Sequence, residues 1–468
     1  MKMNTLLASA LLFALTSGAQ AENITQTYEI AKQQDPLLNK IQARHIGDLE
    51  AGPQARSRFF PKVDAVADIS GNYVDSTSTV RTADVKNDGD YLPQFNPFTT
   101  NDTWESHGAT LMITMPIFHL ENHINMDRAK VLMTKSDYQL QLAEQDLMVR
   151  VADAYLNILT AHDNLKAQQL KKTSAKQQLD QSKDKFNAGL VADLDVQEAQ
   201  SGFDGESAKE IVSLNTLQNT LDNLHEITGQ YQKLFNKFNV ESKFAVPQPN
   251  NIDTWVEKSI ASSYQIRVSE SDVKTAYYDK NLSYTGHLPV LDLTNRAYWN
   301  DAQGGVPSGN DKGDTFPYKQ TNNTTSLQVS MPIFQGNYVT SRSRQAAQDH
   351  IASQHALTET HRAVENNTRH AYLAIVKNIN AIEALKQASR SAEATMKATE
   401  QGLDAGIRTT TEVLNAQSRF HDANYNLAKE QYDFLRNSIL LKQSAGVLTT
   451  ADLKEADGYF SVAEFSVE

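Results

Sequence analysis

The 468-residue sequence contains no cysteine, which excludes disulfide bonds, thiol catalysis and attachment of a lipid through an N-terminal cysteine. Beyond the N-terminus, no stretch has the roughly 20 apolar residues that a membrane-spanning helix needs. Lysine and arginine are scattered rather than clustered, and the net charge is −12, so nothing marks a nucleic-acid-binding surface. Aromatic residues make up only 8% of the chain, which indicates a thin core.

Proline is absent between Pro116 and Pro247 and again after Pro332, and glycine is sparse in both runs. Such runs favour very long helices. A helix from His119 to Asn187 would reach about 100 Å at about 1.5 Å per residue. A helix of that length buries little surface unless it pairs with another.

Apolar residues repeat every seven positions along this predicted helix, in two narrow seams. Two seams indicate a neighbour on each side. The remaining faces are polar, so one can face bulk solvent and the other a water-filled interior. The first seam is Leu140, Leu147, Ala154 and Ala161, matched in the second half by Leu357, Val364, Ala371 and, less well, Asn378; the second is Leu142, Val149, Leu156 and Leu170, interrupted by Asp163.

The stretch FNAGLVADLDVQEAQS (186–201) returns in similar form as LDAGIRTTTEVLNAQS (403–418). Each stretch reads as a helix end, a turn and a helix start. Gly189 and Gly406 supply a residue that can adopt the left-handed conformation closing a helix. In the second copy, Thr409 and Glu412 have the spacing of a capping box. Two such turns indicate one elongated unit built twice.

The chain divides into a signal peptide, two repeats and a tail. Lys2, the apolar run 6–15 and the small residues around Ala21 predict a secretory signal (1–21), with the mature chain starting at Glu22. Repeat 1 (22–246) has short helices, a strand pair (62–116) and a long helix hairpin (119–230). Repeat 2 (247–446) has short helices, a strand pair (289–332) and a hairpin (336–446). An irregular linker (231–251) joins them, and an acidic tail (447–468) has no assigned role.

Four segments of about ten residues alternate apolar and polar side chains. This is the length of a tilted strand that crosses a bilayer with one apolar face. A soluble sandwich with one wet face is the alternative. The alternating apolar positions are Val63, Ala65, Ala67, Ile69 and Tyr73; Ala109, Leu111, Ile113 and Met115; Leu291, Leu293, Ala297 and Trp299; and Leu327, Val329 and Met331.

The connections between paired strands, 75–106 and 301–323, are rich in Asp, Asn, Gly, Thr and Pro, and we predict loops there. Each second strand ends in Met-Pro-Ile-Phe (115–118 and 331–334). A proline removes a ladder donor, so we expect it to stop the sheet and the long helix to follow directly.

Four strands cannot close a membrane barrel, because the smallest spanning barrels have about eight. An open edge in lipid would leave backbone N–H and C=O groups unpaired, and each such group costs on the order of several kcal/mol. Several chains must therefore share one barrel. The sequence itself does not choose between two chains and three.

The order of elements, together with FNAGLVADLDVQEAQS, resembles the TolC family of outer-membrane channel proteins, over nearly the whole mature chain. The resemblance implies a mixed α/β homotrimer, with four transmembrane strands per chain in a 12-stranded barrel and a 12-helix periplasmic tunnel. It implies the exit duct of tripartite multidrug efflux pumps and type I secretion, set in outer membrane lipid. Its partners would be a periplasmic adaptor and an inner-membrane transporter of RND or ABC type. Because the chain has no cysteine that could carry a lipid, it resembles the non-lipidated branch of the family.

By alignment of the turns, the resemblance implies that Asp195 and Arg408 match the family's gating acid and arginine. Glu412 falls where the family has an aspartate of a cation-attracting ring. Leu403 stands where a gating tyrosine is expected, and Asn415 where a second ring aspartate is expected. The implied adaptor-docking tip comprises Gly189, Leu190, Val191, Gly406 and Ile407.

Several of these assignments have a simpler alternative, whereas Arg408, on a tight turn, is harder to explain as an ordinary surface residue. Glu412 and Asp195 stand at the third helical position, where a carboxylate ordinarily satisfies helix amides. Leu190 and Ile407 could be ordinary turn staples. Helix capping and local packing are therefore retained beside gating and docking.

No catalytic constellation or cofactor motif is found, so we expect neither enzymatic activity nor a cofactor. His119 and His123 flank Glu121 but match no metalloprotease order, and we expect no metal site. The alternative to a passive channel is a trimeric structural or adhesive surface stalk without a through-passage.

Overall fold

The computed structural model describes residues 22–466 except 88–89, 240–243, 304–317 and 406. The predicted signal peptide (1–21) lies outside the described residues. The chain forms two compact units, and each takes segments from both sequence repeats. The strand unit comprises residues 49–133 and 274–351; the helical unit comprises the chain up to Asp48, residues 134–273 and residues 352 onward.

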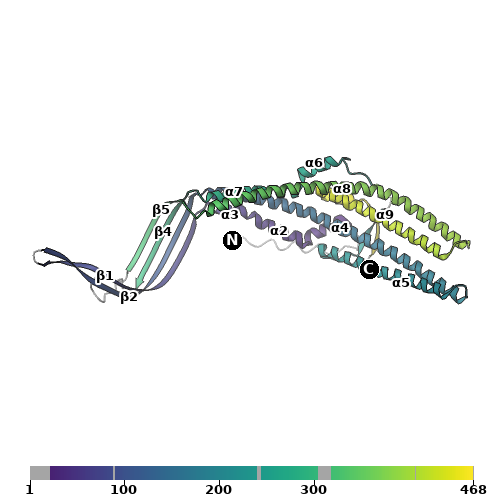
Figure 1. The fold of residues 1–468 in the computed structure, drawn as a ribbon, viewed down its shortest axis with the longest axis horizontal. Helices are drawn as coiled ribbons and strands as arrows, with labels where there is room; N and C mark the ends of the chain where they lie inside the picture. The colour runs from purple at the N-terminus through teal and green to yellow at the C-terminus, as the bar shows by residue number, and fades with distance from the viewer. Residues whose placement is uncertain (1–21, 88–89, 240–243, 304–317, 406, 467–468) are drawn as a thin grey trace, which may run out of the picture. The chain divides into compact units, whose positions relative to one another are not determined.

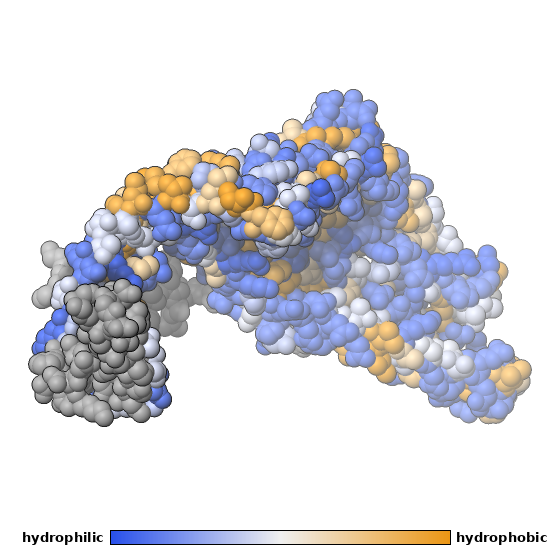
Figure 2. All heavy atoms as spheres, turned by 60° about the vertical axis from the view of Figure 1, so that its left-hand side comes forward, coloured by the Kyte–Doolittle hydropathy of each residue, from blue (hydrophilic) through white to orange (hydrophobic). Residues whose placement is uncertain are grey.

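The strand unit contains an antiparallel sheet of order β1-β2-β4-β5. The predicted alternating segments fall within these four strands or, for Met331, next to one. Many apolar side chains of the sheet are exposed, among them Ile69 (77%) and Val329 (68%). Figure 2 shows hydrophobic side chains gathered over the sheet, whereas hydrophilic side chains dominate the visible surface of the helices. The strands are β1 (Lys62–Asn87), β2 (Asp90–Phe118), β4 (Val290–Gln303) and β5 (Tyr318–Ser330).

The prediction of a loop at 75–106 is wrong, because this segment is mostly strand. β1 and β2 pair from Lys62 opposite Thr114 to Asn87 opposite Asp90, with one register shift between Arg81 and Ala83. The segment is polar at most positions, so the alternation that signals a half-buried strand is missing. Its β-branched residues nevertheless suit a strand, and the backbone pairs whatever the side chains are. In the second connection, strand continues to Gln303 and resumes at Tyr318, and 304–317 lies outside the described residues.

Pro116 does not stop the sheet as expected. The pairing of β2 with β1 has already ended at Thr114, but β2 continues beside β4 to Phe118, with a register shift after the proline. A bulge accommodates the missing donor at an edge position. In the second repeat, the prediction that the long helix follows the strand directly is also wrong. Residues 331–337 are irregular, and Gly336 and Asn337 have positive φ angles of 59° and 64°.

Short helices lie close to their predicted positions. Asp35 accepts a hydrogen bond from the Leu38 amide at 2.8 Å, and Pro36 occupies the first helical position, as predicted. The helical pattern continues through Gly52 and Pro53 instead of ending there. The helices are α1 (Ile24–Gln34), α2 (Pro36–Leu49), α3 (Ala51–Ser57), α6 (Ile252–Ser262) and α7 (Tyr264–Thr285).

The helical unit is built on α4 (Leu120–Asn187), α5 (Asp193–Thr228), α8 (Tyr338–Asp404) and α9 (Thr410–Ser444) (Figure 1). Side-chain contacts place them in the order α5-α4-α9-α8. Lys172 of α4 contacts Glu210 of α5 at 2.5 Å, Lys171 of α4 contacts Asp422 of α9 at 2.5 Å, and Lys377 of α8 contacts Glu430 of α9 at 2.6 Å.

Helix α4 thus has a neighbour on each side, as its two seams predicted. Leu147, Ala154 and Ala161 of the first seam are buried. Asp163, which interrupts the second seam, accepts a hydrogen bond from the buried Tyr432 hydroxyl of α9 at 2.7 Å. The residue that interrupts the seam therefore links α4 to α9 by a hydrogen bond.

The linker and the tail fold against each other, contrary to the expectation of an irregular linker. The linker contains β3 (Leu234–Phe238), and the tail contains α10 (Thr450–Asp457) and β6 (Phe460–Ser466), which pairs antiparallel with β3. Asp457 accepts hydrogen bonds from the Ile24 and Thr25 amides at 2.9 and 3.2 Å. Asp457 of α10 therefore helps to cap the first helix.

Candidate functional site: the helix hairpin tips

The first tip joins α4 to α5 through a left-handed glycine. Gly189 has a φ angle of 71°, and the Leu190 amide donates to the Lys185 carbonyl at 2.8 Å. In the second tip, between α8 and α9, the Ile407 amide donates to the Gly402 carbonyl at 2.9 Å, which is the same six-residue closure. The expected glycine conformation is confirmed at Gly189, and Gly406 lies outside the described residues.

Each tip carries an exposed apolar side chain directly after its turn. Leu190 is 74% exposed and Ile407 is 79% exposed, whereas Val191 is half-buried. A packed turn staple would be covered by its own helices, so these two side chains do not fit that alternative. They are available to a partner.

The second tip also carries an ion pair within one chain. Arg408 Nη1 lies 2.8 Å from Glu412 Oε1. The stem of Arg408 crosses the last turn of α8 at Gly402, where an added Cβ would lie 2.6 Å from Arg408 Cγ. The role of Gly402 was not predicted from the sequence, where its one sign is a glycine four residues before the turn glycine.

Glu412 caps α9 as well as pairing with Arg408. Its Oε2 accepts from the Thr409 amide at 2.8 Å, and the Thr409 hydroxyl accepts from the Glu412 amide at 3.3 Å, so the predicted capping box is confirmed. The hydrogen bond from the Thr409 amide, followed by the Arg408 contact, holds the pKa of the Glu412 carboxyl below its usual value. The carboxylate therefore stays charged at neutral pH.

The other residues predicted for the gate are not gathered into one network by the single chain. Asp195 caps α5, accepting from the Ala192 amide at 3.0 Å, and among the described residues it does not pair with Arg408. Leu403 is half-buried and Asn415 is exposed. Just above the tips, Gln178 of α4 donates to Thr411 of α9 at 3.2 Å.

The two histidines at the start of α4 have structural contacts. His119 Nε2 lies 2.9 Å from Asp292 Oδ1, and the ring of His123 packs edge-on against Phe59. Within the part of the chain that the structure describes, no group of three or more histidine and acidic side chains is arranged to hold a metal ion. In the same described segments, every helix is either too short or too polar to span a membrane.

An exposed apolar sheet, together with helix hairpins whose longer helices have 68 and 67 residues, is characteristic of outer-membrane channel subunits. Solved structures of this class share the fold. The *Campylobacter jejuni* CmeC outer membrane channel aligns over 98% of both chains with a TM-score of 0.71 and 16% identity. The open-state MtrE channel of *Neisseria gonorrhoeae* aligns over 92% of this chain and 94% of its own, with a TM-score of 0.67 and 14% identity.

The sequence profile of the outer membrane efflux protein family matches residues 27–230 and 255–447, and the chain belongs to this family. Outer membrane protein TolC of *Escherichia coli* is 32% identical over 97% of this chain and 88% of its own length. TolC of *Vibrio cholerae* is 28% identical over 99% of both. The alkaline protease secretion protein AprF of *Pseudomonas aeruginosa* is 24% identical over 97% and 90%.

Family membership makes the protein an outer membrane channel whose helical part lies in the periplasm. The family is named for efflux and AprF for alkaline protease secretion, and neither name supports the surface-stalk alternative.

Proposed function

We propose that this protein is the outer membrane exit duct of both tripartite multidrug efflux pumps and type I protein secretion. It is a passive, water-filled channel, and its partners supply the energy. Relatives named for efflux and for protease secretion support the two cargo classes. A periplasmic adaptor and an inner-membrane transporter of RND or ABC type complete the assembly.

Three copies form the working channel. The observation that carries this proposal is the sheet, whose apolar side chains are exposed and whose order leaves β1 and β5 at its edges. Unpaired edges in lipid are costly, so β1 of one copy pairs with β5 of the next. Three sheets give a 12-stranded barrel, and four long helices per copy give a 12-helix tunnel. Residues 22–246 and 247–446 are the two repeats of this design.

The tips form the periplasmic gate and the adaptor-docking surface. Arg408, Glu412, Asp195, Leu403 and Asn415 make up the gate and its constriction. The Thr409 amide and then Arg408 keep the Glu412 carboxylate charged at the second tip, and the Arg408–Glu412 pair fixes the turn beside it.

Docking falls on the glycine turns and the side chains that follow them. The exposure of Leu190 and Ile407 supports this assignment, because an apolar side chain that leaves water for a partner's pocket contributes binding free energy. Gly189, Val191 and Gly406 complete the docking tip.

Single-channel recording in planar bilayers tests the gate. We expect Arg408→Ser to enlarge the conductance about twofold or more, because the arginine can no longer hold the tip closed. The matched control is Arg419→Gln, an exposed arginine further along α9, which should leave the conductance unchanged. An unaltered conductance in Arg408→Ser would remove this residue from the gate.

A further inference from the structure

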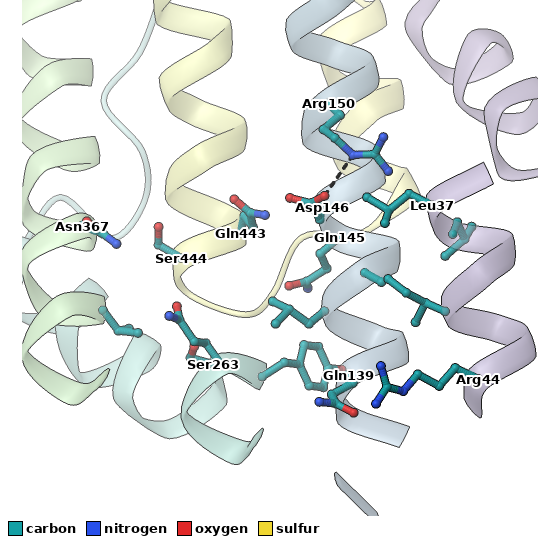
Figure 3. A pocket seen from close by; sticks show the side chains of 17 residues that line it. Leu37, Arg44, Gln139, Gln145, Asp146, Arg150, Ser263, Asn367, Gln443 and Ser444 are labelled. Carbon is teal, nitrogen blue, oxygen red and sulfur yellow. Dashed lines mark hydrogen bonds and ion pairs between the residues drawn. The ribbon is translucent and has the colours of Figure 1, made fainter. Parts of the chain in front are cut away.

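A cavity of about 600 Å³ lies in the helical unit, where segments of both repeats converge. Figure 3 shows it between α2, α4, the start of α7, α8 and the end of α9. Its volume falls within the range of sites for drug-sized ligands. It is separate from the tips, and the gating and docking of the channel do not use it.

One wall of the cavity is apolar. This wall is formed by Leu37 and Ile41 of α2, Leu142 of α4 and the buried Val364 of α8. Leu37 is 43% exposed. An apolar guest that covered this wall would gain about 25 cal/mol for each Å² of apolar surface removed from water.

A single unpaired cation stands on the same wall. Arg44 follows Leu37 and Ile41 at helical spacing, so the three side chains share one face of α2. In Figure 3 its side chain extends from α2 toward Gln139 of α4. Among the described residues, the Arg44 guanidinium has no hydrogen-bond or ion-pair partner.

The other charged groups at the cavity are already paired. Arg150 donates to both carboxylate oxygens of the buried Asp35, at 3.1 and 2.8 Å, and to Asp146 at 2.9 Å. The positive charge of Arg150 is therefore already paired with two carboxylates. Arg44 remains the cation that a guest can engage.

We infer that this cavity binds a monoanionic amphiphile. Its carboxylate or sulfate would accept the forked hydrogen bonds of Arg44, and its apolar chain would cover the wall formed by Leu37, Ile41 and Leu142. Gln139, beside Arg44 in Figure 3, offers an amide group near the head. A neutral amphiphile leaves Arg44 unpaired, and a cationic one is repelled by it.

Photo-crosslinking in outer membrane vesicles tests this with the assembled protein and without detergent. A diazirine analogue of laurate should label the peptides that carry residues 37–44 and 139–146. Excess laurate should compete for the label, and the same concentration of dodecyltrimethylammonium should not. Arg44→Gln should reduce the labelling about tenfold, as expected for losing one charge-assisted hydrogen bond. Arg44→Lys should restore part of it, and Arg419→Gln should change nothing.

Three results would overturn the inference. Equal competition by the cationic amphiphile would show non-specific partitioning. Unchanged labelling in Arg44→Gln would remove the anion site. Labelling of dissociated chains but not of the assembled protein would show that a neighbouring copy covers the cavity. The competition arm uses the unmodified protein, so it decides the question even if a variant folds poorly.

Discussion

Glu412 combines two tasks at one residue. It closes the capping box of α9 with Thr409, and it pairs with Arg408. The corresponding acid of the first tip, Asp195, caps the Ala192 amide and pairs with no arginine among the described residues. The sequence predicted both caps from spacing alone. It could not show that Arg408 turns toward Glu412, because that depends on the Gly402 surface over which the arginine stem passes.

The first residue-scale prediction concerns Glu412→Gln. The glutamine loses the charge that Arg408 and the Thr409 amide favour, so the cap weakens and the channel's preference for cations falls. Hydrogen exchange of the peptide around Thr409 should speed up, and reversal-potential measurements should show reduced cation selectivity. Asp195→Asn is the control, and it should speed exchange only in the first tip.

The pH dependence of the same residue follows from its lowered pKa. A carboxyl whose folded-state pKa is depressed contributes its stability above its ordinary value of 4.5 and loses it as the pH falls through the lowered value. Protection of the Thr409 amide should therefore be constant, after correction for intrinsic exchange, from neutral pH to about pH 5. Loss of protection near pH 6 would contradict the capping role.

At the scale of elements, the sharp end of α4 follows from glycine. Gly189 has a positive φ angle, which costs another residue about 1 kcal/mol or more. Gly202, inside α5, has open space where a Cβ would stand. Gly189→Ala should therefore lower the stability of the helical unit by about 1 kcal/mol, whereas Gly202→Ala should raise it by up to about 1 kcal/mol. Denaturant titration followed by far-UV circular dichroism distinguishes the two, and equal shifts would refute the turn assignment.

The long helices and the membrane-length strands were predictable because their signals are local: absent prolines, seven-residue seams and alternation. The pairing of β3 with β6 was not, because its partners lie more than 220 residues apart in sequence, as Leu234 opposite Ser466 shows. The ribbon formed by β1 and β2 beyond Asp75 was missed because a polar strand has no alternation to detect. The prediction that Pro116 stops the sheet failed because the sequence does not reveal that one side of β2 is already unpaired there.

The C-terminal elements provide another prediction at this scale. Deleting residues 447–468 removes the Asp457 carboxylate from the Ile24 and Thr25 amides and uncovers Phe235, which packs against Phe465. Helix α1 should then exchange its amides faster and become a site of protease cleavage. Asp457→Asn should show the same change of α1 in weaker form, at about 1 kcal/mol for a lost cap. Unchanged protection of α1 in the deletion would show that the tail does not hold it.

At the scale of the whole molecule, a single chain leaves its site incomplete. Alignment of the two turns located the acids and Arg408 at the tips, but within the described residues Asp195 meets no arginine. The exposed Leu190 and Ile407 likewise have no cover. A closed gate therefore has to draw contacts from neighbouring copies, which no reading of one sequence can place.

The last prediction tests closure directly and uses the absence of native cysteine. A cysteine in β1 at Ala65, combined in turn with single cysteines along β5, should give crosslinked species of two and three chains and none larger, because three sheets close the ring. The control pair, Ala67→Cys with Ala109→Cys, joins residues that face each other within one chain, so it should leave monomers. A ladder that continues beyond three would mean an open polymer, and monomers at every β5 position would mean that β1 does not meet β5 of a neighbour. Either result would remove the trimeric barrel, and with it the reason for an uncovered apolar sheet.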